Sequence, residues 1–381
     1  MITSTPAFGL GVRPHANLGQ AQGGRHESLD KRVDEVVHSD LRVTLPEASN
    51  GGHLLDKMAR GANSSDNSGN GDRLYNQVAH KIQISDEMRD GGKVTDNIIA
   101  EAITYLHRDG VLILENAINP SHLDDLETIL GPEADVIAND PDHHFNFGKV
   151  LAPPLDPDLM YKDIWANPAG VAIMNAMFGS CVCHYANGNT ALKATGRQPV
   201  HSDIDKPHPL WPFAFAFNIP LCDTSVENGS TEIWIGSHRD SNIDQHSAFA
   251  GGESGLTIKQ DLLDERRQHS PPVQPSTKKG SLIIRDIRLW HAGMPNRTDK
   301  PRIMLAFVIQ PRWFNAPSKV ILPLRAKALV EQWTAETGLE YNATWIDGEV
   351  DHKKINSEEV DFSSRNKSML GLEHMMHLHV H

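Results

Sequence analysis

Residues 212–221, PFAFAFNIPL, decide the fold class because large apolar side chains occupy every second position. Phe213, Phe215, Phe217 and Ile219 alternate with small or polar residues, which is the two-residue period of a half-buried β-strand. Further β-rich runs, separated by clusters of Gly, Pro, Asn and Asp, are STEIWIG (230–236), GSLIIRDI (280–287) and RIMLAFVIQP (302–311). Several strands at this spacing predict a β-sandwich or a β-barrel.

The chain before this β-rich part has mainly helical patterns. Residues 95–110, TDNIIAEAITYLHRDG, place their apolar side chains on one helical face and end at a glycine. Residues 119–131 and 167–179 each begin with Asn-Pro and end with Gly, which predicts an N-cap, a first helical residue and a stop. Residues 110–118 predict a buried strand, and residues 324–337 predict a later helix.

These patterns divide the chain into four regions. Residues 1–75 form a leader that includes RGANSSDNSGNGDR, and we expect it to be disordered or loosely ordered. Residues 76–180 form an N-terminal helical support region, residues 181–320 the β core, and residues 321–381 a C-terminal helix and arm.

Composition narrows the class of partner. The 381 residues are 39% hydrophobic and carry a formal net charge of −13, which argues against a nucleic-acid partner. No apolar run reaches the roughly 20 residues of a membrane span, and the first residues lack a secretory signal pattern. Three cysteines cannot build a disulfide framework, so we expect a cytoplasmic protein with a small-molecule substrate. A homodimer is the candidate assembly.

The segment QPVHSDID (198–205) contains the first candidate metal ligands. His201 and Asp203 are two residues apart, so in an extended segment both side chains point to one face. His291, which follows the strand 280–287, is the leading candidate for a third ligand. Two imidazoles and one carboxylate on one face of an ion are typical of non-haem Fe(II) oxygenases. A turn capped by the carboxylate is the alternative for the first two residues, and Asp205 is an alternative ligand.

Arg302 supports the oxygenase interpretation. It begins the apolar run 302–311, where a guanidinium is costly to bury unless its charge is paired. Such a group can bind a carboxylate in a bidentate arrangement, and a chelating 2-oxo acid with a distal carboxylate would satisfy both metal and arginine. A structural salt bridge or a position on the rim is the alternative for this residue.

Over residues 105–314 the chain resembles the phytanoyl-CoA dioxygenase family of Fe(II)- and 2-oxoglutarate-dependent oxygenases. Four segments carry the resemblance: LHRDGVLILENAINPSHLDDL, QPVHSDID, ENGSTEIWIGSHR and WHAGMPNRTDKPRIML. One departure is Ile235, which stands before Gly236 where the family usually has proline. The resemblance implies a mainly β fold with flanking helices around a double-stranded β-helix (jelly-roll, cupin-like) core.

The resemblance also implies roles for individual residues. His201, Asp203 and His291 would be the iron ligands, and Arg302 would bind the far carboxylate of 2-oxoglutarate, assisted by Thr231. Gln198 would contact the co-substrate or the ligand shell. Fe(II) would be the cofactor, with 2-oxoglutarate and O₂ as co-substrates. A carboxylate at position 203 favours hydroxylation or another oxidation begun by hydrogen abstraction over halogenation.

Three functions therefore stand side by side. The first is a dioxygenase that oxidises an unactivated C–H bond of a small, largely apolar molecule, such as a natural product, with release of succinate and CO₂. The second is a non-redox, metal-dependent enzyme on a cupin-type barrel. The third is a catalytically silent binding subunit.

Overall fold

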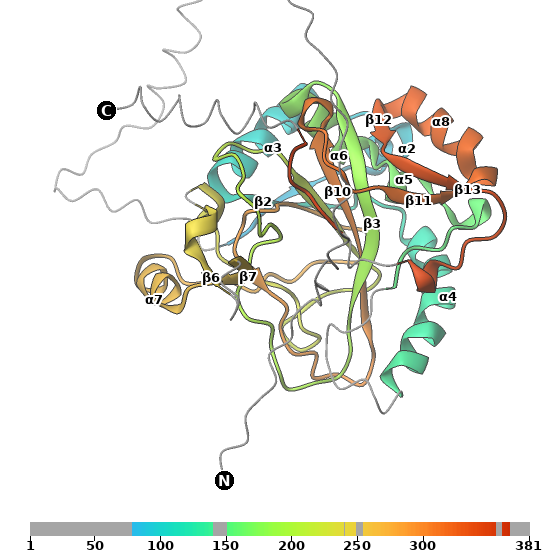
Figure 1. The fold of residues 1–381 in the computed structure, drawn as a ribbon. Coiled ribbons are helices and arrows are strands. Elements are labelled where there is room, and N and C mark those ends of the chain that lie inside the picture. Colours follow the sequence, from blue (N-terminus) through green and yellow to red (C-terminus); the bar gives the residue numbers. More distant parts are fainter. Residues whose placement is uncertain (1–77, 140–150, 240, 249–253, 356–359, 366–381) are drawn as a thin grey trace, which may run out of the picture. The chain divides into compact units, whose positions relative to one another are not determined.

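A seven-stranded sheet forms the centre of the computed structural model, which describes residues 78–139, 151–239, 241–248, 254–355 and 360–365 (Figure 1). The strand order is β1-β2-β8-β4-β10-β3-β12, antiparallel from β2 to β3 and parallel at both edges. The strands are β1 (His80–Gln83), β2 (Val111–Glu115), β8 (Leu282–Asp286), β4 (Phe215–Pro220), β10 (Arg302–Pro311), β3 (Cys181–Ala191) and β12 (Leu339–Tyr341).

Helices cover one face of this sheet. Phe215, Phe217 and Ile219 of β4 belong to the largest apolar cluster, together with helical residues such as Leu106 and Ile173. The helices are α2 (Asp86–Gly91), α3 (Asp96–Asp109), α4 (Pro120–Ala138), α5 (Lys162–Trp165), α6 (Pro168–Phe178) and α8 (Lys327–Thr337). The other face of β4 is buried as well, so the half-buried strand predicted for residues 212–221 is wrong in its exposure. A second layer of strands explains the difference.

The second layer is a smaller sheet built from short segments. β5 (Glu232–Ile233) pairs with β9 (His291–Ala292) in antiparallel register. Single bridges extend this pair on both sides, from Ile233 to Val273 and from His291 through His201 to Thr257. Two facing sheets with helices on the outside form the mainly β jelly-roll core that the resemblance implied, and this prediction is confirmed.

The predicted helix ends are confirmed in two of three cases. α3 begins after Thr95, whose side chain accepts a hydrogen bond from the Ile98 amide, and ends at Gly110 with a φ of 74°. α6 begins after Asn167 and ends before Gly179. The stop predicted at Gly131 is wrong, because α4 continues to Ala138 and its buried face extends past Gly131 to Ala134. Packing against the core therefore overrides the glycine.

The remaining elements lie around the two sheets. They are the hairpin of β6 (His246–Ala248) and β7 (Ser254–Ile258), the helix α7 (Gln260–His269), and the pair β11 (Val320–Pro323) and β13 (Ala343–Ile346). The described residues all belong to one compact unit, in which β1 and β2 of the helical support region join the large sheet. The leader expected at 1–75 lies outside the described residues. No helix in the described ranges is long and apolar enough to cross a membrane.

Candidate metal centre

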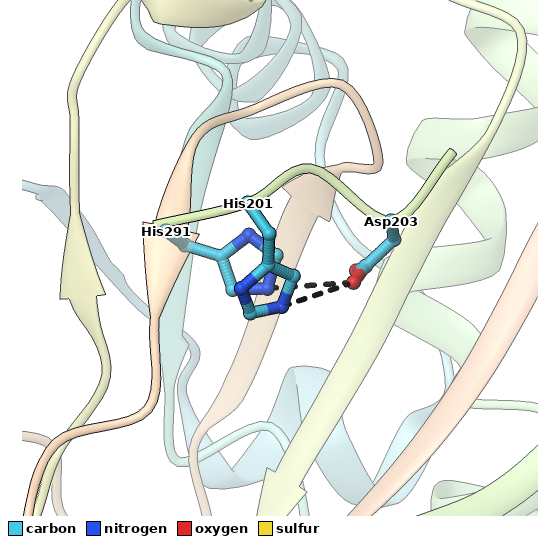
Figure 2. A group of neighbouring side chains, drawn as sticks. All are labelled: His201, Asp203 and His291. Atoms are coloured by element: carbon cyan, nitrogen blue, oxygen red, sulfur yellow. Dashed lines mark ion pairs between the residues drawn. The ribbon is translucent and has the colours of Figure 1, made fainter. Parts of the chain in front are cut away.

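Backbone pairing brings the three predicted metal ligands together. The amide of His201 donates to the carbonyl of His291 and the amide of His291 donates back, each at 2.9 Å. The amide of Asp203 donates to the carbonyl of Ile287 at 2.8 Å, which ties this segment to the end of β8. The side chains of His201, Asp203 and His291 then point toward one another (Figure 2), and their ligand atoms lie within 4.8 Å of one another.

The donor set fits a divalent metal ion. Asp203 Oδ1 lies 3.8 Å from His201 Nε2 and 3.4 Å from His291 Nε2. Donor atoms that bind one face of an octahedral ion at roughly 2.1 Å lie about 3 Å apart, so small side-chain movements suffice. Both Nδ1 atoms donate to backbone carbonyls, those of Pro199 and Leu289, each at 2.9 Å. Each Nε2 lone pair is therefore left for a metal.

The protonation states also suit a metal. Burial, together with the neighbouring imidazole of His291, lowers the pKa of His201 to about 4. Burial alone would raise the pKa of Asp203, but the positive charge of Arg285 and the imidazoles of His291 and His201 hold it well below its usual value. At neutral pH the site therefore presents a neutral imidazole at His201 and an ionised carboxylate at Asp203, which are the forms that bind metal.

Arg285 belongs to this site, although sequence reasoning missed it. Its Nη2 donates to Asp203 Oδ2 at 2.5 Å, and its Nη1 lies 3.2 Å from His291 Nδ1. The signal was present in GSLIIRDI, where a guanidinium interrupts an apolar strand as Arg302 does in RIMLAFVIQP. The same burial argument applied to both arginines would have found it.

A small cavity lies next to the metal centre, between the two sheets. Arg302 lines it and is 1% exposed, and burial lowers its pKa to about 10. Its Nη1 contacts Met304 Sδ at 3.7 Å, and its Nε has no hydrogen-bond partner among the residues that the structure describes. The other polar side chains that line the cavity are Asn218, Thr224, Ser230, Thr231 and Arg285. Within the described ranges Arg302 has no salt bridge, so the structural alternative for it lacks support.

The remaining candidates lie elsewhere. Gln198 is not among the residues that line the cavity, and its Oε1 accepts a hydrogen bond from the amide of Gly293 at 2.9 Å. The side chain of Asp205 is 41% exposed next to Lys206 and is not part of the ligand group.

The turn that carries His291 is fixed by a fully buried ion pair. Arg288 donates to Asp286 from Nε at 2.9 Å and from Nη2 at 2.6 Å, and its Nη1 donates to the carbonyls of Pro209 and Leu210. The Ser237 hydroxyl accepts a hydrogen bond from the Trp290 amide at 2.8 Å. These contacts leave the backbone before His291 little freedom.

The family model described as phytanoyl-CoA dioxygenase matches residues 106–304, more than half of the chain. Among solved structures, EctD from S. alaskensis with bound Fe is 20% identical, with a TM-score of 0.41 over 57% of this chain and 79% of that one. The epimerase SnoN in complex with Fe3+, alpha ketoglutarate and nogalamycin RO is 15% identical, with a TM-score of 0.42 over 57% and 84%.

AviO1 from Streptomyces viridochromogenes Tue57 is 17% identical, with a TM-score of 0.41 over 58% of this chain and 97% of that one. The match of the family model confirms the family expected from the four sequence segments. The chain belongs to the phytanoyl-CoA dioxygenase family of Fe(II)- and 2-oxoglutarate-dependent oxygenases.

Proposed function

We propose that this protein is a dioxygenase that binds Fe(II) through His201, Asp203 and His291 and oxidises an unactivated C–H bond of a small, largely apolar molecule. The observation that carries the proposal is the combination of a two-imidazole, one-carboxylate group with a cavity whose wall holds a buried arginine. 2-Oxoglutarate requires both features, because its 2-oxo acid end chelates the metal and its other end is a carboxylate.

Arg302 is the group that would recognise the co-substrate. Its burial makes the free guanidinium costly, and no anion from the described part of the chain offsets that cost. The far carboxylate of 2-oxoglutarate would supply the missing charge through a bidentate contact. Thr231 lines the same cavity and would donate its hydroxyl to that carboxylate.

The residues at the centre would hold the metal with one face open. Iron bound there would supply the activation of O₂ that drives the oxidation, with release of succinate and CO₂. The carbonyls of Pro199 and Leu289 orient the two imidazoles by accepting their Nδ1 protons. Gln198 would act on the metal ligands indirectly, because its Oε1 accepts a hydrogen bond from the amide of Gly293, two residues after His291.

An apolar cluster supports an apolar substrate. On the same strand faces that line the cavity, Ala216 of β4 and Val308 of β10 lie further along the strands. They pack with aromatic side chains, including Phe213 and Phe314, and the cluster includes Ile204, the residue after Asp203. The metal centre therefore has a cationic cavity and an apolar environment close by. We infer that 2-oxoglutarate occupies the first and that the substrate approaches from the second.

Release of succinate tests the proposal. Protein reconstituted with Fe(II) should convert 2-oxoglutarate to succinate in air, and the Asp203→Ala and His291→Ala variants should not. Metal binding without succinate release would favour the non-redox enzyme, and loss of both would favour the silent subunit. Mass spectrometry of small molecules retained by the anaerobic protein with iron and 2-oxoglutarate would then identify the substrate.

A further inference from the structure

We propose that Arg285 is a positioning residue. It holds one carboxylate oxygen of Asp203 in a hydrogen bond, so that Asp203 binds the metal through its other oxygen only. This inference rests on the proposed function, since it assigns the metal to the group of His201, Asp203 and His291. It adds a residue that neither the sequence motifs nor the ligand group contains.

The two oxygens of Asp203 face different partners. Oδ2 accepts the hydrogen bond from Arg285 Nη2 at 2.5 Å, whereas Oδ1 is the oxygen 3.4 Å from His291 Nε2. A charge-assisted hydrogen bond of this kind is about twice as strong as a neutral one. As long as it holds Oδ2, the carboxylate cannot turn both oxygens toward an ion between the imidazoles.

The guanidinium is itself held rigidly. The side chain of Arg285 is 7% exposed, and its residue lies in the middle of the large sheet, opposite Val111 of β2 on one side and Ala216 of β4 on the other. A group mounted on a strand paired along both edges has little freedom to follow the carboxylate. Arg285 therefore sets the orientation of Asp203 and not the reverse.

The consequence is an open coordination face. Three protein ligands, each bound through a single atom, leave three positions of an octahedral ion for a chelating co-substrate and O₂. A carboxylate bound through both oxygens would occupy one of these three. Arg285 also lines the cavity that Arg302 lines, so a co-substrate bound there would meet two positive charges.

A Co(II) titration of the metal-free, full-length protein tests the inference, because it reports affinity and coordination geometry without any turnover. The wild type should bind one Co(II) per chain. Arg285→Met should bind it roughly 10- to 100-fold more weakly, the usual range when a group that orients a metal ligand is lost. Its visible absorption spectrum should also change, because Asp203 is free to use both oxygens. Arg285→Lys, which keeps the charge, should lie between the two.

Arg197→Met is the matched control. Arg197 donates to both carboxylate oxygens of Glu232 in the smaller sheet, at 3.1 and 2.7 Å, and is outside the ligand group. Its affinity for Co(II) and its spectrum should equal those of the wild type. If Arg285→Met does not fold, as judged by circular dichroism, Arg285→Lys carries the test with an expected loss of several-fold.

The outcomes separate this inference from the proposed function. A wild type that binds no Co(II) contradicts the proposed function. A wild type that binds Co(II), with Arg285 variants of equal affinity and an identical spectrum, overturns only the role of Arg285.

Discussion

Two arginines of this protein are equally buried but differ in their surroundings. Arg288, in the turn between β8 and β9, and Arg302, at the start of β10, are each 1% exposed. Arg288 is satisfied by Asp286 and by two backbone carbonyls. Arg302 has a sulfur contact at 3.7 Å and, among the described residues, no anionic partner. The difference distinguishes Arg288, whose charge is paired within the fold, from Arg302, whose charge we propose is paired by a ligand.

The largest effect should come from removing the satisfied arginine. Arg288→Met leaves the Asp286 carboxylate buried without its partner, which should reduce the free energy of unfolding by about 3 to 5 kcal/mol. Chemical denaturation of the metal-free protein measures this loss. Arg302→Met is the matched comparison. It should leave the free energy of unfolding unchanged or raise it, because removing this charge leaves no buried anionic partner unpaired among the described residues. Equal losses in the two variants would contradict the distinction.

The region around Arg288 should also respond to pH. His238 is buried near Asp286, and burial lowers its pKa to about 4. The unfolded chain, with an ordinary histidine pKa near 6.5, binds more protons between these values. Stability is therefore full above about pH 6.5 and falls as the pH drops toward 4, by an amount on the order of 3 kcal/mol for this group. His238→Gln should flatten the dependence, and an unchanged slope would refute the assignment.

Replacing Arg302 should weaken the binding of the co-substrate. Arg302→Met should weaken the binding of 2-oxoglutarate to the Mn(II)-loaded protein by about 30-fold, roughly 2 kcal/mol, because a charge-assisted contact is lost. Calorimetry measures this change. The affinity for Mn(II) alone should stay at the wild-type value, and its collapse would mean that the residue supports the metal centre instead.

The smallest effect should come from replacing Thr231, an uncharged residue that lines the same cavity. Thr231→Val keeps the shape of the side chain and removes one hydroxyl, so 2-oxoglutarate should bind about fivefold more weakly, roughly 1 kcal/mol. The same calorimetric titration detects it. An effect as large as that of Arg302→Met would mean that the hydroxyl, and not the guanidinium, dominates recognition.

The sequence predicts the metal group because the spacing carries the geometry. A two-residue separation puts His201 and Asp203 on one face of an extended segment, and the family motifs add His291. The burial of Arg285 in an apolar run was visible in GSLIIRDI, but its role was not, because its partner Asp203 lies in a distant segment and such pairing is not visible in one sequence. The exposure predicted for residues 212–221 was wrong for a similar reason, since a period of two does not reveal a second layer of strands. The stop at Gly131 failed because tertiary packing extended the helix.

Calorimetric titration of 2-oxoglutarate, with O₂ excluded, into metal-free and Mn(II)-loaded protein tests the central claim most directly. If His201, Asp203 and His291 hold a metal beside the cavity of Arg302, one 2-oxoglutarate should bind per chain, tightly only when Mn(II) is present. Asp203→Ala should abolish the dependence on metal. Equal binding of 2-oxoglutarate with and without Mn(II), or none under either condition, would contradict the account.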